Sequence, residues 1–151
     1  KKLSFPLTKN QLNLIHSISC TLAKRSYDKK IFRGLSANQV DHAENIAVIA
    51  WREYSHHSYH LKTLVLINPS YKHIRPYEDN KAWEQSLSLP HDVGEVWRFS
   101  HIRYKYQNSL GEHKSAVASA EKARILQQTI DQLQGRLFTD LMTRDSRLLH
   151  H

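Results

Sequence analysis

The sequence contains one cysteine, Cys20, in 151 residues. An intramolecular disulfide is therefore excluded, and such cysteine usage is typical of a reducing compartment. Because Cys20 lies in a stretch with helical periodicity, we expect it to be a small core residue rather than a nucleophile. We expect a cytoplasmic protein, with an organelle reached through a removed leader as the alternative.

The sequence also has no apolar run that approaches the length of a transmembrane helix. The short apolar stretch after Lys1 and Lys2 is interrupted from Thr8 onward, too early for a signal peptide. We therefore expect no membrane contact. Glycine and proline are limited to four residues each, and no internal repeat is present. A chain of this size can bury about two thirds of its unfolded surface, so we expect a single domain, residues 1–151.

The apolar pattern predicts an α+β protein with mixed or antiparallel sheets. Residues 12–22 follow a helical period after Thr8, a candidate N-cap. Residues 46–51 and 61–67 are rich in apolar and β-branched residues, which predicts a hairpin joined by the polar stretch between them.

Further along, residues 71–78 predict an edge segment and residues 97–106 alternate as a strand. A late helix follows, with Ser115 or Ser119 as its cap and Gly135 at its end. The polar stretch of the hairpin contains His56, His57 and His60. No acidic or cysteine partner accompanies these histidines at a recognised metal-binding spacing, so we interpret them as a solvated loop.

The late helix has the residue spacing of a metalloenzyme helix but not its metal-binding and catalytic residues. Leu126, Ile130 and Leu133 recur at spacings of four and three and form one apolar stripe. Gln128 and Gln132 stand one turn apart, where a metalloprotease-type helix carries two histidine ligands with a glutamate beside the first. Such a Gln-x-x-x-Gln pair is most often a solvated face. The position of the glutamate is occupied by Thr129.

Three segments together resemble the motifs of peptide deformylases. Residues 34–39 (Gly-Leu-Ser-Ala-Asn-Gln) are similar to the family's Gly-Leu-Ala-Ala-x-Gln, and residues 84–90 (Glu-Gln-Ser-Leu-Ser-Leu-Pro) to its Glu-Gly-Cys-Leu-Ser-x-Pro. Residues 127–135 then resemble its Gln-His-Glu-x-Asp-His-Leu-x-Gly, and Arg98 stands where the family has an arginine. The resemblance covers roughly residues 10–142, and it implies sheets wrapped around the motif helix together with an N-terminal helix.

The resemblance also implies a divalent metal held by one cysteine and two histidines, with a glutamate as general base. In this sequence the ligand positions are Ser86, Gln128 and Gln132, and the base position is Thr129. A neutral hydroxyl and amide oxygens are poor ligands for iron, zinc or nickel. We therefore expect a degenerate member of the family without metal or other cofactor.

Other parts of the family's pocket are retained, notably Gln39 and the backbone amide of Leu87, which in the family stabilise the oxyanion. Their retention indicates either a pocket that still accepts a carbonyl group or residues that merely close the fold. The expected binding pocket consists of Gln39, Ser86, Leu87, Arg98, Gln128 and Gln132.

These observations leave three functional hypotheses. The first is an inactive deformylase-like protein, or pseudoenzyme, that acts by binding, with a peptide in the former active site. The second is a hydrolase with Ser86 or Ser88 as nucleophile and His91 or His101 as base. The third is an RNA- or ribosome-associated module, in keeping with the translation-linked role of the family, a net charge of +8 and a pI near 9.7. Its contacts would come from the densest basic run, Lys24, Arg25, Lys29, Lys30 and Arg33.

Overall fold

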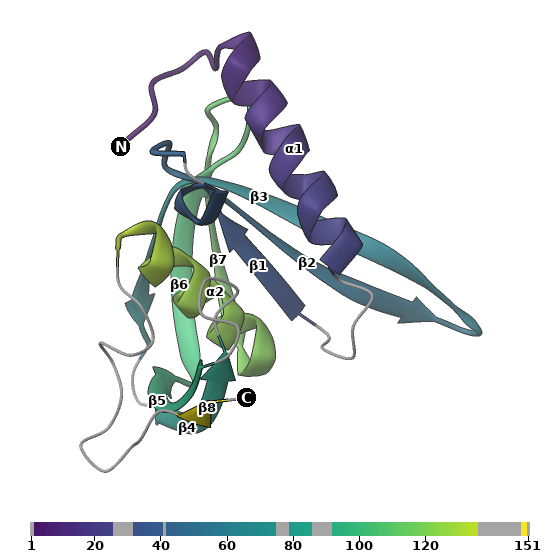
Figure 1. The fold of residues 1–151 in the computed structure, drawn as a ribbon, viewed down its shortest axis with the longest axis vertical. Helices are drawn as coiled ribbons and strands as arrows, with labels where there is room; N and C mark the ends of the chain where they lie inside the picture. The colour runs from purple at the N-terminus through teal and green to yellow at the C-terminus, as the bar shows by residue number, and fades with distance from the viewer. Residues whose placement is uncertain are drawn as a thin grey trace.

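The computed structural model of the chain describes residues 2–25, 32–40, 42–74, 79–85, 92–135 and 149–150. Within these residues all strand pairs are antiparallel, and two α-helices accompany them, which confirms the α+β prediction (Figure 1). In chain order the elements are α1 (Lys9–Arg25), β1 (Phe32–Ser36), the 3-10 helix η1 (Ala37–Val40), β2 (Ile46–Ser55), β3 (Ser58–His73), β4 (Asp79–Gln85), β5 (Asp92–Phe99), β6 (His101–Gln107), β7 (His113–Ser119), α2 (Ala120–Leu133) and β8 (Leu149–His150).

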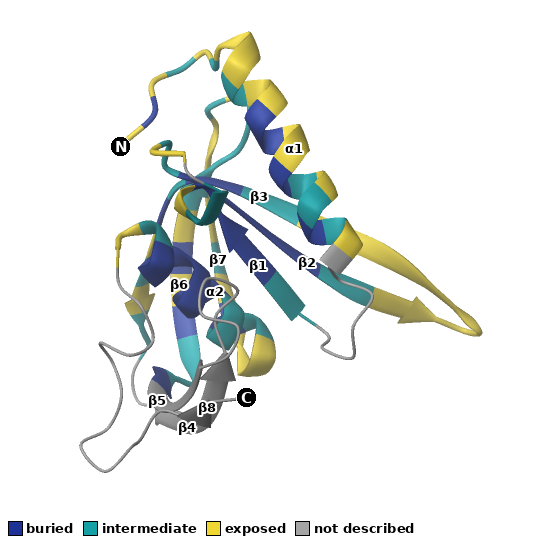
Figure 2. Cartoon of the chain, viewed as in Figure 1, coloured by how far each residue is buried: buried dark blue, intermediate teal, exposed yellow. Residues whose placement is uncertain are grey.

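The strands form a five-stranded sheet of order β1-β2-β3-β6-β7 and a three-stranded sheet of order β4-β5-β8. The first half of β2 is fully buried on both faces, because helices cover it from opposite sides. Figure 2 shows the buried residues gathered along the centre of the larger sheet and on the inward sides of both helices. The α1 side of the core contains Leu14, Ile15, Ile18, Leu22, Leu35, Ile46, Val48, Ala50 and Ile67. The α2 side contains Ala47, Ile49, Leu66, Ile102, Tyr104, Ala118, Ala123 and Leu126.

Two tyrosines on β6 belong to the α2 side of this core. The rings of Tyr104 and Tyr106 stack with their centroids 5.8 Å apart. Burial raises the pKa of Tyr104, and burial together with the Tyr104 charge raises the pKa of Tyr106. Both phenols therefore stay neutral at physiological pH.

The β2–β3 hairpin is longer than the sequence predicts. Its strands run to Ser55 and resume at Ser58, so the turn consists of His56 and His57. His56 and His57 are therefore in an exposed loop, as predicted, whereas His60 lies within β3, opposite Glu53, so the loop interpretation was wrong for His60.

Cross-strand side-chain pairs accompany the strands in this polar extension. The rings of Tyr54 and Tyr59 lie 5.7 Å apart, and the Arg52 guanidinium lies 4.8 Å from the Tyr59 ring centroid. A hairpin arm needs no apolar face to satisfy its backbone, which is why the polar pattern did not reveal it. The arm projects past the rest of the sheet (Figure 1).

The N-terminal helix starts where the sequence predicts. The Thr8 hydroxyl accepts a hydrogen bond from the Gln11 amide at 3.1 Å, and the Gln11 side chain accepts one from the Thr8 amide at 2.9 Å. Cys20, in contrast, is exposed, so its assignment to the core was wrong. It lies about 200° around the helix from the buried Ile18, given about 100° per residue.

Tyr71–His73 were expected in a separate edge segment, but they form the end of β3 and pair with β6. That pairing joins segments about thirty residues apart, so local sequence does not reveal it. At the start of α2, Ser119 is the N-cap residue, although its side chain makes no capping hydrogen bond, while Ser115 lies in β7. Gly135, with φ of +83°, follows the end of α2 as predicted.

A buried ion pair fixes α2 across the two sheets. The Asp131 carboxylate accepts a hydrogen bond from the Arg98 guanidinium at 2.6 Å, and each side chain is 2% exposed. The other carboxylate oxygen accepts one from the Tyr71 hydroxyl at 2.8 Å. Arg98 comes from β5 of the smaller sheet and Tyr71 from β3 of the larger sheet, so one carboxylate joins α2 to both.

One turn earlier, Gln127 extends the backbone pairing of β5. Its side-chain oxygen accepts a hydrogen bond from the Phe99 amide at 2.9 Å, and its nitrogen donates to the Phe99 carbonyl at 2.8 Å. The same nitrogen also donates to the Ala123 carbonyl at 3.0 Å. The side chain thus serves as a peptide-like partner at the end of the strand and fixes the rotation of α2.

Removing the arginine should destabilise the protein because a buried carboxylate would lose its countercharge. We expect Arg98→Met to lower the free energy of unfolding by about 3–5 kcal/mol, measured by urea denaturation. Arg103→Met, at an exposed arginine on β6, is the matched control and should change it by no more than about 0.5 kcal/mol. Adding Asp131→Asn to Arg98→Met should recover part of the loss; equal effects of Arg98→Met and Arg103→Met would contradict this assignment.

Candidate functional site

The α2 positions that differ from the deformylase motif are buried. Gln128 is 9% exposed and Gln132 is 4% exposed, so the pair does not form the solvated face that is usual for this spacing. They lie one turn apart on the helix, as the spacing predicts. Their amide groups therefore face the protein interior. There a hydrogen bond is stronger than in water, and an unpaired polar group costs more free energy.

Thr129, at the position of the family's general base, packs directly against β1. Its hydroxyl donates a hydrogen bond to the Ile125 carbonyl at 2.7 Å, one turn back on α2. A Cβ atom added to Gly34 would lie 2.0 Å from the Thr129 hydroxyl oxygen. Only glycine at position 34 allows α2 and β1 to approach this closely while Thr129 keeps its place.

The first family motif folds against the same helix. Gln39 in η1 accepts hydrogen bonds through its side-chain oxygen from the Ser36 amide at 2.9 Å and the Ser36 hydroxyl at 3.0 Å. The Asn38 side-chain nitrogen donates to the Gln132 carbonyl of α2. The structure thus brings the first and third motifs together, through this hydrogen bond and through the packing of Gly34 against Thr129.

The second motif is not part of this geometry. Ser86, Leu87, Ser88 and His91 lie outside the described residues, so their convergence with Gln128 and Gln132 stays a prediction. His101, the other imidazole considered as a base, precedes the buried Ile102 on β6, and by strand alternation it faces away from α2. Its Nδ1 lies 3.1 Å from the Ser100 hydroxyl.

The donor groups at these positions do not fit the metal that the family implies. Gln128 and Gln132 offer neutral amide groups, and the Thr129 hydroxyl already donates to a backbone carbonyl. Iron, zinc and nickel favour thiolate and imidazole ligands. Across the described segments, which include His56, His57 and His60, no group of three or more His, Cys, Asp or Glu residues could hold a metal ion.

The basic run is only partly described. Lys24 is exposed on α1 and Arg33 is half-buried on β1, while Lys29 and Lys30 lie outside the described residues and nothing is assigned to the Arg25 side chain. Whether these cations share one surface stays a prediction. Neither α1 nor α2, the helices of the described part, is long and apolar enough to cross a bilayer.

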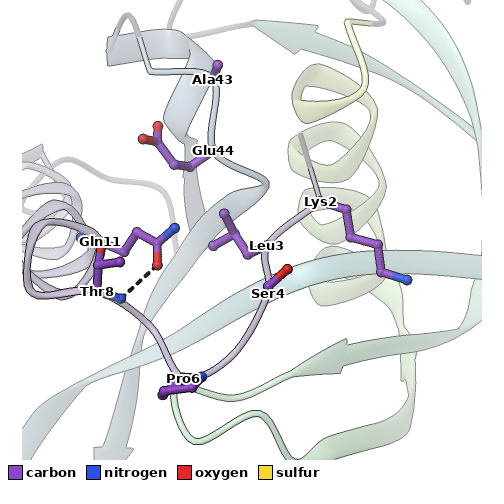
Figure 3. Close-up of a pocket in the computed structure, with 8 residues that line it drawn as sticks. All are labelled: Lys2, Leu3, Ser4, Pro6, Thr8, Gln11, Ala43 and Glu44. Atoms are coloured by element: carbon purple, nitrogen blue, oxygen red, sulfur yellow. Dashed lines mark hydrogen bonds between the residues drawn. The ribbon is translucent and has the colours of Figure 1, made fainter.

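A pocket of about 460 Å³ lies at the N-terminal end of α1, away from the motif residues (Figure 3). Sequence reasoning did not identify it, because its walls come from an irregular N-terminal segment and a loop before β2. Figure 3 shows Thr8 and Gln11 on one side and Glu44 on another. The residues that line it are Lys2, Leu3, Ser4, Pro6, Thr8, Gln11, Ala43 and Glu44.

The contact between α2 and β1 generates a coupling prediction. We expect Gly34→Ala to lower the free energy of unfolding by about 1–3 kcal/mol, because the new methyl group overlaps the Thr129 hydroxyl. In the Thr129→Ala background the same change should cost less, since the overlapping oxygen is gone. A double-mutant cycle measured by urea denaturation reports the coupling, and strictly additive effects would contradict the packing described.

Comparison with known proteins gives one consistent family. The family model described as polypeptide deformylase matches residues 3–147. The peptide deformylase of Chlorobium limicola is 36% identical over 117 residues, which is 76% of this chain and 60% of that protein. Peptide deformylase 2 of Rickettsia conorii is 29% identical over 148 residues, covering 93% of this chain and 70% of that protein.

Solved structures agree with the sequence matches. The peptide deformylase of Plasmodium falciparum, in complex with an inhibitor, superposes with a TM-score of 0.74 at 27% identity, over 95% of this chain and 80% of that one. This chain spans about 60% of the length of the Chlorobium relative. Because the family model spans nearly all of the chain and the fold matches, this chain belongs to the peptide deformylase family.

Proposed function

We propose that this chain is a deformylase-family protein without the metal-dependent reaction, and that it acts by binding. The observation that carries the proposal is the set of side chains at the four chemical positions. Serine, two glutamines and a threonine stand where the family pattern has a cysteine, two histidines and a glutamate. Each substitution removes a different requirement of metal-assisted hydrolysis.

The ligand substitutions remove the affinity for the metal. Near neutral pH a serine hydroxyl remains protonated, and a glutamine amide carries no basic lone pair comparable to that of imidazole. The metal in this family would activate the attacking water and polarise the formyl carbonyl. Gln128 and Gln132 cannot substitute for it in either role.

The substitution at position 129 removes the proton carrier. A general acid-base typically contributes about 10²–10⁴ in rate, and a threonine hydroxyl does not ionise in the relevant pH range. The hydroxyl of Thr129 is also engaged with the Ile125 carbonyl. Loss of the base and loss of the ligands affect separate steps, so restoring one alone would not restore turnover.

The binding part of the proposal rests on what the same helix keeps. Gln127 and Asp131, which match the family pattern, anchor α2, and Gln39 is held beside Ser36. A pocket framed by Gln39, Gln128, Gln132 and Arg98, with Ser86 and Leu87 as the expected opposite wall, would offer amide groups to a peptide backbone. An N-terminal peptide segment is therefore the proposed ligand class.

The relatives found by comparison are named peptide deformylases, so the competing outcome is an active enzyme. A formate-release assay on formyl-methionyl peptides, with elemental analysis of the same sample, decides between the two. We expect no formate and no stoichiometric iron, zinc or nickel, with the Chlorobium limicola protein assayed in parallel as a positive control. Formate release with one such metal per chain would overturn the proposal.

The proposal also predicts that the scaffold can regain a metal. Ser86→Cys, Gln128→His, Thr129→Glu and Gln132→His in one protein should bind zinc or nickel, because the two histidines would lie one turn apart on a rigid helix. Isothermal titration measures the affinity, and the protein with Thr129→Glu alone is the matched control. A folded quadruple variant that binds no metal would show that the residue 86 segment does not approach α2.

A further inference from the structure

One face of the β3–β6–β7 part of the larger sheet turns away from α2. Ile102, Tyr104 and Ala118 point to the α2 core, so their neighbours on the same strands point outward. In the register of the sheet, Lys72, Arg103 and Val117 form one outward row. Ser70, Lys105 and Ser115 form the next, and all six residues are exposed.

The charge on this face has one sign. Residues 70–73, 101–107 and 113–119 contain four lysines and arginines and no aspartate or glutamate. Three of these cations, Lys72, Arg103 and Lys105, point outward and are defined here as the sheet cation patch. Arg103 and Lys105 on the central strand β6 are exposed, as is Val117 beside them on the edge strand β7, so no described side chain covers the patch.

The arrangement is unfavourable for the isolated protein. Lys72 lies directly opposite Arg103 on the neighbouring strand, and like charges in that position repel. Lys105 follows two residues later on the same face of β6. Among the described residues, none of the three forms an ion pair, since the described side-chain pairs are His42 with Glu44 and Arg98 with Asp131.

We propose that the sheet cation patch binds the phosphate backbone of double-stranded RNA. Phosphates on both sides of a groove would neutralise cations on two adjacent strands and remove their mutual repulsion. Arginine and lysine contact phosphate oxygens, and the hydroxyls of Ser70 and Ser115 are placed beside Lys105 to bond sugar or phosphate oxygens.

The shape of the patch favours RNA over other polyanions. Arg103 and Lys105 lie on the central strand β6, and the side chains beside them on β3 and β7 include the small residues Ser70, Ser115 and Val117. The face is therefore a shallow surface with its cations along the middle, which fits the wide, shallow minor groove of A-form RNA with its 2′-hydroxyls. The major groove of B-DNA instead admits an inserted helix or ribbon. An anionic membrane would require several apolar side chains for insertion, whereas Val117 is the apolar residue of the two rows.

The test measures the affinity of the full chain for a short, mixed-sequence RNA duplex. Fluorescence anisotropy of the labelled RNA reports binding at each of a series of salt concentrations. The patch variant carries Lys72→Ser, Arg103→Ser and Lys105→Ser. The control variant carries Lys2→Ser, Lys9→Ser and Lys62→Ser, which removes the same charge from exposed positions in the N-terminal segment, on α1 and on the hairpin. Circular dichroism confirms that both variants are folded.

We expect the patch variant to lose at least tenfold in affinity at low salt. Its slope of log affinity against log salt should fall by about two to three units, since each phosphate contact contributes nearly one. The control variant should lose much less on both measures. Equal losses in the two variants, or no binding by the unmodified chain, would overturn the proposal.

Two further probes separate RNA from other polyanions. A DNA duplex of the same sequence and vesicles containing phosphatidylserine should bind the unmodified chain more weakly than the RNA does, and equal or tighter binding would contradict the assignment.

Lysine acetylation with and without the RNA gives a readout that needs no variant. Lys72 and Lys105 should be protected while Lys9 and Lys62 are not. The inference does not depend on the proposed loss of the metal reaction.

Discussion

The buried carboxylate of Asp131 is the constraint on which the arrangement depends. A charge 2% exposed is stable only where a countercharge and further donors meet it, and here Arg98 and Tyr71 supply them from different sheets. These contacts join helix α2 to both sheets and fix its position. Gln127 then sets its rotation through Phe99, so the faces that carry Gln128, Thr129 and Gln132 are determined as well.

Within one helix, the residues that hold the fold match the deformylase pattern and those that would perform its chemistry do not. Gln127 and Asp131 are as the pattern has them, while positions 128, 129 and 132 are changed. All three of these side chains are buried, and the Thr129 hydroxyl donates a hydrogen bond to the Ile125 carbonyl and lies close to Gly34. This separation underlies the proposal of a binding function.

Local signals in the sequence predicted local structure well. The Thr8 cap of α1, the apolar stripe of α2 and the family motifs were all predicted from short spacings. Features that depend on contacts between residues distant in the sequence were not predicted. Exposure of Cys20 and the length of the hairpin arm follow from which elements pack together. The sheet cation patch was equally hidden, because Lys72 and Arg103 are far apart in sequence and meet only in the register of β3 and β6.

The central claim is that the motif helix is kept in place by its buried ion pair while the former metal position holds no metal. The most direct test is a crystal structure from crystals grown in excess nickel, with anomalous diffraction data collected at the nickel absorption edge. We predict Arg98 paired with Asp131, Thr129 against Gly34, and no anomalous peak between Gln128, Gln132 and the residue 86 segment. A strong peak there, coordinated by side chains of this chain, would contradict the account.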